Sequence, residues 1–160
     1  PGEPAEILTN EAMGIELDVN YINDNGFNLN LNTTFQDTEI TASATNQGNE
    51  TQRQPGWQMR LTPSYDFEMN DDMLVTLYGT FSAVDDRYGD NANTVILDGY
   101  KKVDLGVIFE PMENLKLQLS VDNLTDEMGI TEGDPRNPTA PNGRYILPRS
   151  IKFSVSYQLF

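Results

Sequence analysis

The stretch that decides the fold is Ser150-Ile151-Lys152-Phe153-Ser154-Val155-Ser156-Tyr157-Gln158-Leu159-Phe160. Apolar and polar side chains alternate along it with a period of two, which is typical of a β-strand with one apolar and one polar face. The same alternation recurs in six other segments of the chain. The sequence therefore predicts an all-β, antiparallel sheet of about seven strands. The other segments are residues 14–22, 27–35, 59–69, 74–84, 103–110 and 115–122.

The connections between these segments alternate between short and long. The turns after the first, third and fifth segments have about four residues, whereas the other connections have about 15 to 23. An up-and-down meander with one plain end and one elaborate end gives this pattern, and loops this long are usually functional. Pro63 interrupts the third segment and predicts a bulge or a locally broken pairing, because proline has no backbone N–H to donate.

The composition excludes several classes of chemistry. The chain has 160 residues, with 10 Lys and Arg against 25 Asp and Glu, a formal net charge of −15, and neither His nor Cys. Zinc fingers, disulfide frameworks and catalysis by Cys or His are therefore excluded. Nucleic acid is not an expected partner, because the negative charge would repel a phosphate backbone. No apolar run is long enough for a transmembrane helix, and Pro1-Gly2-Glu3-Pro4 lacks the features of a signal peptide.

The alternation by itself leaves two architectures open. In a soluble β-sandwich, the apolar faces of two sheets meet to form a core. In an outer-membrane β-barrel, the apolar face contacts lipid and the polar face lines the lumen. Strands of about ten residues with short turns at one end and long loops at the other are typical of the barrel.

Four stretches of the chain carry a resemblance to a known family. Residues 121–126, Val-Asp-Asn-Leu-Thr-Asp, are similar to a V-N-N-L-F-D stretch, with Thr125 where Phe is usual. Residues 143–150, Gly-Arg-Tyr-Ile-Leu-Pro-Arg-Ser, are similar to a G-R-x-x-x-P-R-S opening of the last strand. Residues 105–117 are similar to a late hairpin, and residues 9–17 to an N-x-x-x-x-G-x-E-L strand opening. In this order, they resemble the C-terminal part of a TonB-dependent outer-membrane receptor.

The resemblance implies that residues 1–160 are the C-terminal portion of a large transmembrane β-barrel of about 22 strands. The plug domain and the earlier strands would be absent from this chain. The implied function is part of an active transporter in the cell outer membrane of a Gram-negative bacterium, which takes up a scarce nutrient such as an iron-siderophore or an oligosaccharide. Neither enzyme activity nor a cofactor is expected.

The resemblance also implies a set of partners. These are outer-membrane lipid, the plug domain and remaining barrel strands of the same receptor, the TonB complex through regions outside this chain, and the barrel-assembly machinery. The short turns would then be periplasmic and the long loops, near residues 38–58, 85–100 and 125–148, extracellular. The stretch 129–136 is similar to loops of the carbohydrate-utilisation branch of the family.

Candidate ligand-binding residues lie in or beside the long loops. The aromatic candidates can stack on a sugar or a siderophore, although an interfacial girdle or loop packing is the favoured interpretation. Arg136 and Arg144 can bind an anionic ligand or simply pair with Glu132 and Asp134. The acidic residues within 66–72 and within 85–98 form two groups, and neither fits an EF-hand. No metal site is therefore expected, although loop oxygens can still bind a hard cation. The aromatic candidates are Trp57, Tyr88, Tyr100 and Tyr145.

Tyr157 and Phe160 resemble the family's C-terminal signal for barrel assembly. In the family, the Tyr usually stands two residues before the terminal Phe, and both face lipid. Here the spacing is three, so strict alternation puts Phe160 on the opposite face, unless a bulge or a frayed end reconciles the two.

Two alternative functions remain open at this point. One is a soluble, secreted β-sandwich that binds carbohydrate through its loop aromatics. The other is a small standalone outer-membrane barrel with a structural role. Seven strands cannot close into a barrel alone, because both edges of the sheet would expose unpaired backbone groups.

Overall fold

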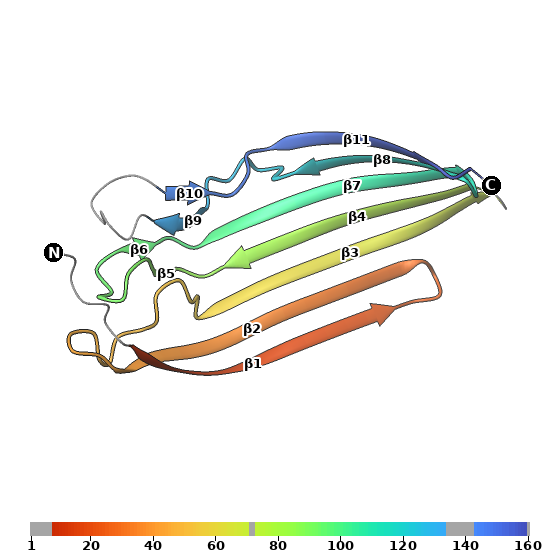
Figure 1. The fold of residues 1–160 in the computed structure, drawn as a ribbon. Helices are drawn as coiled ribbons and strands as arrows, with labels where there is room; N and C mark the ends of the chain where they lie inside the picture. The colour runs from red at the N-terminus through yellow and green to blue at the C-terminus, as the bar shows by residue number, and fades with distance from the viewer. Residues whose placement is uncertain (1–7, 71–72, 134–142, 160) are drawn as a thin grey trace.

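Seven long β-strands dominate the computed structural model, which describes residues 8–70, 73–133 and 143–159. They form a single antiparallel sheet, and strands adjacent along the chain are adjacent in space (Figure 1). Two small two-stranded sheets accompany it. The long strands, in the order that they take in the sheet, are β1 (Thr9–Ile22), β2 (Phe27–Ala42), β3 (Trp57–Asn70), β4 (Met73–Val84), β7 (Tyr100–Met112), β8 (Leu115–Asp122) and β11 (Ser150–Tyr157). The short pairs are β5 (Arg87–Tyr88) with β6 (Ile96–Leu97), and β9 (Ile130–Gly133) with β10 (Gly143–Tyr145).

The predicted seven-stranded meander is confirmed, but several predicted strand ends are wrong. β1 begins at Thr9 and β2 continues to Ala42, so residues 38–42 belong to a strand and not to a loop. Side chains in this part of the ladder do not alternate between apolar and polar, as the pairs Met13↔Asp37 and Glu11↔Glu39 show. Main-chain hydrogen bonds extend the strands here without an apolar pattern in the sequence. The first two long connections are therefore shorter than predicted, at residues 43–56 and 85–99, whereas the third is longer, at residues 123–149.

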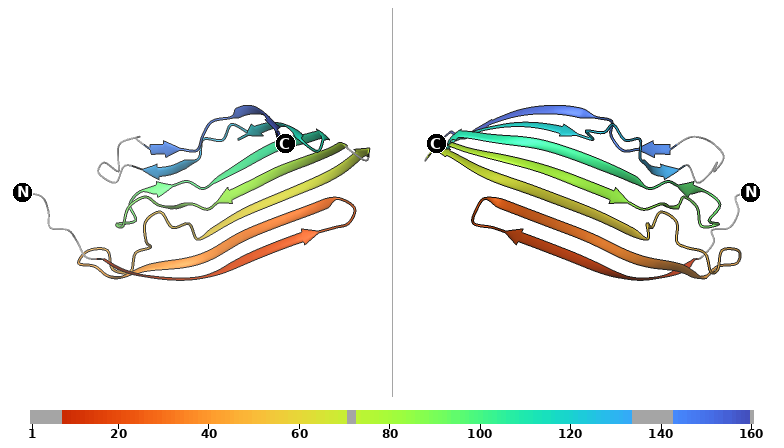
Figure 2. Two further views of the ribbon diagram at one scale, coloured as in Figure 1. Left: turned by 45° about the vertical axis from the view of Figure 1, so that its right-hand side comes forward. Right: turned by 180° about the vertical axis from the view of Figure 1, so that it is seen from behind.

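One face of the sheet is apolar from edge to edge. The register aligns Leu77 with both Tyr65 and Val107, and Leu119 with both Val107 and Phe153, in one continuous row across five strands. Phe153 is 67% exposed and Ile15 is 71% exposed, which shows that the protein leaves these side chains of the apolar face uncovered. Figure 2 shows the reason, since the seven strands form one curved layer with no second layer against either side.

The single layer contradicts the β-sandwich alternative. A sandwich buries its apolar faces between two sheets, whereas Ile40, Ala83 and Leu97 are the only fully buried hydrophobic side chains among the described residues. Exposing an apolar face of this size to water is unfavourable by about 25 cal/mol for each Å². The apolar face therefore requires an apolar surrounding that this chain does not supply.

The opposite face is polar and carries its own ion pairs. Lys102 lies 2.8 Å from Asp104, and Lys116 lies 2.9 Å from Glu110. Gly106 is needed on this face because the ring of Tyr78 lies against it, and a Cβ at Gly106 would overlap that ring. The Tyr78 hydroxyl in turn accepts a hydrogen bond of 2.6 Å from Gln118. Side chains on this face are thus joined to one another by ion pairs and hydrogen bonds.

Pro63 breaks the pairing locally, as predicted, but it makes no bulge. The ladder between β3 and β4 runs to Leu61↔Phe81 and resumes at Ser64↔Tyr78 in the same register. On its other side, Pro63 still lies opposite Leu29 of β2. The missing N–H therefore costs ladder bonds on one side only, and the alternation of faces continues through it.

The two edges of the sheet are β1 and β11. Both strands are exposed over almost their whole length, and neither has a second neighbouring strand among the described residues. Across those residues, no helix has the length and apolar character needed to cross a membrane.

Candidate functional site

Three long loops lie together at one end of the sheet, opposite the short turns (Figure 1). We name them the first loop (residues 43–56), the second loop (85–99) and the third loop (123–149). The second loop contains the β5–β6 hairpin and the third contains the β9–β10 hairpin. The sequence predicted the loops but not these four short strands, because strands of two to four residues are too short to show a periodicity.

The first and second loops are joined by main-chain and side-chain hydrogen bonds. The backbone N–H of Arg53 donates to the carbonyl of Tyr88 at 2.6 Å. Asn93 accepts from the backbone N–H of Glu50 at 2.8 Å and donates to the Glu50 carbonyl at 3.0 Å. Arg53 and Asn93 both adopt positive φ angles, of 62° and 55°, so these contacts fix tight bends in both loops.

Glu132 joins the first loop to the third. One of its carboxylate oxygens lies 2.7 Å from Nη1 of Arg53, and the other lies 3.2 Å from Nη1 of Arg144. Glu132 and Arg144 face each other across the β9–β10 hairpin. A single carboxylate thus holds two guanidinium groups from two different loops.

Arg87 joins the second loop to the third. Its side chain is buried, with the residue only 7% exposed, and Nη2 donates to the carbonyls of Ile130 at 2.7 Å and Thr131 at 3.1 Å. Carbonyl acceptors satisfy the donors of a buried guanidinium, but they do not neutralise its charge. We call Arg53, Arg87 and Arg144, with Glu132, the arginine cluster.

Asn123 closes the base of the third loop. It is 1% exposed, and its side chain both accepts from the N–H of Glu127 and donates to the carbonyls of Glu127 and Leu147, each at 2.9 Å. Its own N–H donates to the Asp104 carboxylate at 2.7 Å. The two ends of the loop are therefore tied to each other and to β7 through one residue. Its φ of 51° is a left-handed conformation that Asn tolerates better than most residues.

A second contact reinforces the same base. The N–H of Arg149 donates to the Asp126 carboxylate at 2.9 Å, and the Leu124 N–H donates to the Val103 carbonyl at 2.7 Å. Residues 123–126 and residues 143–150 thus lie against each other at the base of the loop. Their polar residues hold the loop closed at its base.

Asp90 organises the tip of the second loop. Burial raises the pKa of its carboxyl. Hydrogen bonds from the Thr94 hydroxyl and from the N–H groups of Val95 and Thr94 together lower that pKa by more, so it lies below the ordinary value. The bonded form is the carboxylate.

The lowered pKa of Asp90 predicts a pH dependence of the second loop. The hydrogen bonds of the Asp90 carboxylate stabilise the loop at neutral pH. This stabilisation is lost as the pH falls through the folded-state pKa, which lies below the ordinary aspartate pKa of about 3.9. We expect hydrogen exchange at the Thr94 and Val95 amides, corrected for intrinsic rates, to rise on acidification. Asp90→Asn should remove this dependence; the same pH profile in both proteins would contradict the assignment.

Two of the predicted aromatic residues begin strands at the edge of the loops. Trp57 opens β3 and Tyr100 opens β7, and both line a hollow of about 350 Å³. The ring of Tyr100 packs closely on Gly129, where a Cβ would lie 2.5 Å from the ring. Trp57 lies opposite Phe35 on the apolar face. Whether the two rings pack as girdle and loop residues or bind a ligand stays a prediction.

The other predicted residues are divided between the loops and the far end. Tyr88 lies in β5, and Tyr145 lies in β10 with 52% of its surface exposed. Arg144 is paired with Glu132, as the sequence allowed, while Arg136 lies outside the described residues. Tyr157 ends β11 on the apolar face opposite Leu115. Phe160 also lies outside the described residues, so its predicted face stays a prediction.

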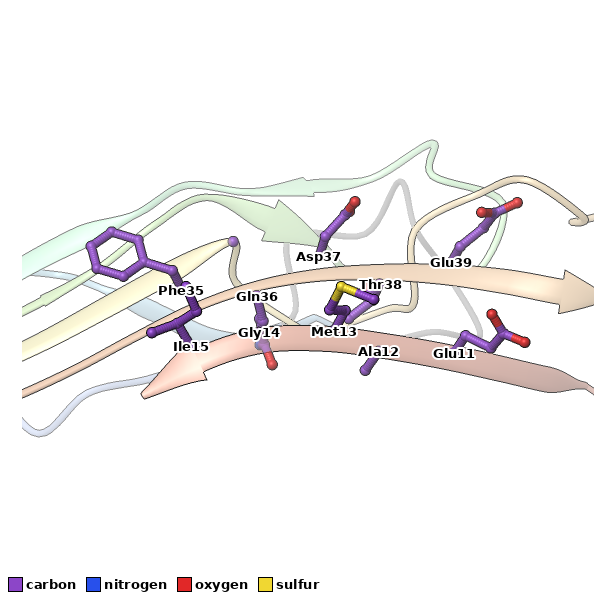
Figure 3. Close-up of a pocket in the computed structure, with 11 residues that line it drawn as sticks. Glu11, Ala12, Met13, Gly14, Ile15, Phe35, Gln36, Asp37, Thr38 and Glu39 are labelled. Carbon is purple, nitrogen blue, oxygen red and sulfur yellow. The ribbon is translucent and has the colours of Figure 1, made fainter. Parts of the chain in front are cut away.

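A separate pocket of about 650 Å³ lies on β1 and β2 near the loops (Figure 3). Phe35, Asp37 and Glu39 point to one side of the two strands, whereas Ala12 points to the other. None of the predicted ligand-binding residues lines it. The pocket lies along the open edge of the sheet and is a property of that edge.

Sequence reasoning missed Arg53, Arg87 and Asn123 as members of this site. A signal was present, because each long loop carries at least one arginine in an otherwise acidic or neutral context. No group of three or more His, Cys, Asp and Glu residues is arranged to hold a metal ion among the described residues.

Comparison with known proteins gives consistent results. A family model described as "TonB dependent receptor-like, beta-barrel" matches residues 9–124. Similar solved structures include BauA, the ferric preacinetobactin receptor from Acinetobacter baumannii, with 24% identity and a TM-score of 0.80, covering 94% of this chain and 22% of that one. FyuA, the ferric yersiniabactin uptake receptor from Yersinia pestis, has 17% identity and a TM-score of 0.84, with 96% and 24% covered. The siderophore receptor PiuA from Acinetobacter baumannii has 22% identity and a TM-score of 0.75, with 94% and 22% covered.

Proposed function

The chain belongs to the family of TonB-dependent receptor-like β-barrels, and we propose that it forms part of the wall of an outer-membrane receptor that imports a scarce nutrient. The observation that carries the proposal is the uncovered apolar face of a single-layer sheet. Lipid is the apolar surrounding that such a face requires, and the polar face then lines the lumen. Receptors of this kind are transporters, and no catalytic role is proposed.

The whole barrel would be several times larger than this chain. The chain spans less than a quarter of the receptors that it resembles, at 22% and 24% of their lengths. We propose that residues 1–160 are its C-terminal portion, with further strands pairing with the open edges of β1 and β11. The strand added beside β1 would cover the pocket of Figure 3.

The remaining partners follow from this placement. A plug domain of the same receptor would contact the polar face through hydrogen bonds and ion pairs, and the TonB complex would act through regions outside this chain. Tyr157 and Phe160 would present the barrel to the assembly machinery. The short turns would be periplasmic and the three long loops extracellular, in the outer membrane of a Gram-negative bacterium.

The joined loops are the proposed place of nutrient binding. Arg144 and Tyr145 are the most accessible of the described candidates, whereas Trp57, Tyr88 and Tyr100 border the loops. Arg136 belongs to the same third loop by its place in the sequence. A ferric siderophore is the favoured cargo, because the names of all three solved relatives specify ferric or siderophore receptors. An oligosaccharide remains the second candidate, because of the resemblance of residues 129–136.

Deletion of the full-length gene tests the proposal. We expect the deletion to abolish energised uptake of one class of radiolabelled cargo, either a ferric siderophore under iron limitation or an oligosaccharide supplied as sole carbon source. Uptake should return with the intact gene and fail when TonB is absent. Uptake that is independent of TonB, or a full-length protein that is folded and monodisperse without detergent, would overturn it.

A further inference from the structure

The base of the third loop carries three exposed apolar side chains, those of Leu124, Met128 and Leu147. We infer that they contact the lipid of the outer leaflet, so that the base of this loop belongs to the membrane-embedded surface and does not lie in water. The inference rests on the proposed function, because it takes the apolar face of the sheet as the lipid contact. It is carried by the lengths of two strands and by the exposure of these three side chains.

β8 and β11 are too short to cross the apolar part of an outer membrane. Each has eight residues, whereas the other five long strands have 12 to 16. Eight residues extend about 26 Å along a strand, and a tilt of about 40° reduces this height to about 20 Å. The lipid-facing band of such a barrel is about 25 Å tall, and a spanning strand needs about 9–11 residues. These two strands therefore leave part of the band to other residues.

The missing part of the band lies at the loop end of the sheet. On β7, the apolar face extends to Val103, which pairs with Phe81 of β4. The ladder between β7 and β8 reaches only Val121, opposite Leu105, so the row of Phe81 and Val103 is not continued by a paired residue of β8. The third loop takes that place (Figure 1). The N–H of Leu124 donates to the Val103 carbonyl at 2.7 Å, so the loop begins beside this row.

Asn123 holds the three apolar residues in an ordered arrangement. Leu124 follows it directly, Leu147 accepts a hydrogen bond from it, and Met128 follows Glu127, whose N–H and carbonyl both bond to the Asn123 side chain. Even so, Met128 is 81% exposed, Leu147 76% and Leu124 38%. Leaving ordered apolar groups in water is unfavourable by about 25 cal/mol for each Å². Their exposure therefore indicates an apolar surrounding that this chain does not supply.

The other two loops do not share this feature. Among the described residues, the first loop has no exposed large hydrophobic side chain, and the second has only Ile96, which is 61% exposed. Being in a loop is therefore not enough to explain the apolar residues of the third. The third loop alone connects the two strands that are too short, at the position where the apolar face has to be continued. This continuity with the apolar face identifies lipid as the partner.

Charged residues place the contact near the edge of the membrane. The Asp126 carboxylate accepts from the N–H of Arg149 at 2.9 Å, and both residues are exposed. Nη1 of Arg149 also donates to the Leu124 carbonyl at 3.4 Å. A long side chain of this kind can lie along apolar groups while its charged end reaches water. The three apolar residues therefore fit the interfacial layer of the membrane, and not its centre.

Spin labels in the full-length receptor test this inference. Residues 1–160 contain no cysteine, so Met128→Cys and Leu147→Cys can be labelled singly once any cysteine elsewhere is replaced by serine. The measurement compares collisions of the label with oxygen, which concentrates in hydrocarbon, and with a water-soluble nickel chelate. The receptor is held as single copies in nanodiscs, so that a second copy cannot cover the label.

Ile96→Cys is the matched control, because Ile96 is also an exposed apolar residue of a long loop. We expect the ratio of oxygen to nickel collisions at Met128→Cys and Leu147→Cys to be at least about threefold above the ratio at Ile96→Cys. Two further labels calibrate the scale. Phe153→Cys reports the apolar face of β11, and Ser154→Cys reports the polar face, opposite Gln118. Heat-modified electrophoretic mobility shows whether each variant is a folded barrel.

The outcomes separate this inference from the proposed function. Ratios at Met128→Cys and Leu147→Cys as low as that at Ile96→Cys, with a high ratio at Phe153→Cys, would overturn the inference and leave the proposed function standing. Few collisions with either reagent would mean that another part of the receptor covers these residues, which also overturns it. A ratio at Phe153→Cys as low as that at Ser154→Cys would contradict the proposed function itself.

Discussion

Phe153→Arg in the full-length receptor is expected to destabilise the barrel folded in lipid by about 2–4 kcal/mol. Phe153 lies near the middle of β11 on the apolar face, opposite Leu119, and is 67% exposed. A guanidinium at this depth must leave water or draw water and headgroups into the hydrocarbon, and both are unfavourable. Among the described residues, the cross-strand row on that face consists of Leu119, Val107 and Leu77, so it offers no carboxylate to pair with the arginine.

Ser154→Arg is the matched control for this substitution. Ser154 is the next residue in the same strand and lies on the polar face opposite Gln118, so the same charge would enter the lumen. We expect a change below about 1 kcal/mol in urea titrations of folding into lipid vesicles, followed by heat-modified mobility. Equal destabilisation by the two variants would mean that the apolar face does not contact lipid.

Asn123→Asp is expected to open the base of the third loop. The substitution replaces an amide that donates to the carbonyls of Glu127 and Leu147 with a carboxylate that cannot donate to either. The part-buried carbonyls of Glu127 and Leu147 would lose their donor, and the carboxylate would lie in a buried position beside the carboxylate of Asp104. An unsatisfied buried polar group costs about 1–3 kcal/mol, and we expect a local loss of this size.

Limited proteolysis of the receptor in outer-membrane vesicles measures this opening. The variant should be cut within residues 123–149 at least about tenfold faster than the wild type, because cleavage follows the population of the open form. Gln47→Glu is the control, since it also exchanges an amide for a carboxylate, but at an exposed position in the first loop. Equal cutting of Asn123→Asp and the wild type would show that this residue does not hold the loop.

The sequence predicted the sheet well because one physical rule governs most of it. Every second residue had to be apolar, so the faces of β8 and β11 could be assigned from Leu115–Asp122 and Ser150–Tyr157 alone. The rule fails where polar residues pair through backbone bonds, as at Glu11↔Glu39, and the predicted ends of β1 and β2 were wrong there.

The candidate site was less predictable, because its contacts join residues far apart in the chain. Arg144 and Glu132 could be paired from the sequence, since they lie in one loop. The contact of Arg53 with Glu132 spans several strands and the whole second loop, and nothing in the sequence near Arg53 indicates it. Asn123 was noticed only as part of a resemblance, and its role at the base of the loop depends on a carbonyl 24 residues away.

The two rims of this wall differ in how far across the sheet their contacts reach. At the short-turn end, the hydrogen bonds between described residues reach an adjacent strand, as when the N–H of Asp66 donates to the carbonyl of Gly26 and that of Gln158 donates to the carbonyl of Asn114. At the other end, the pair of Arg53 and Glu132 bridges from the β2–β3 connection to the β8–β11 connection. We expect this ion pair to resist separation of the strands between the two connections, so deformation of the wall should begin at the short-turn rim.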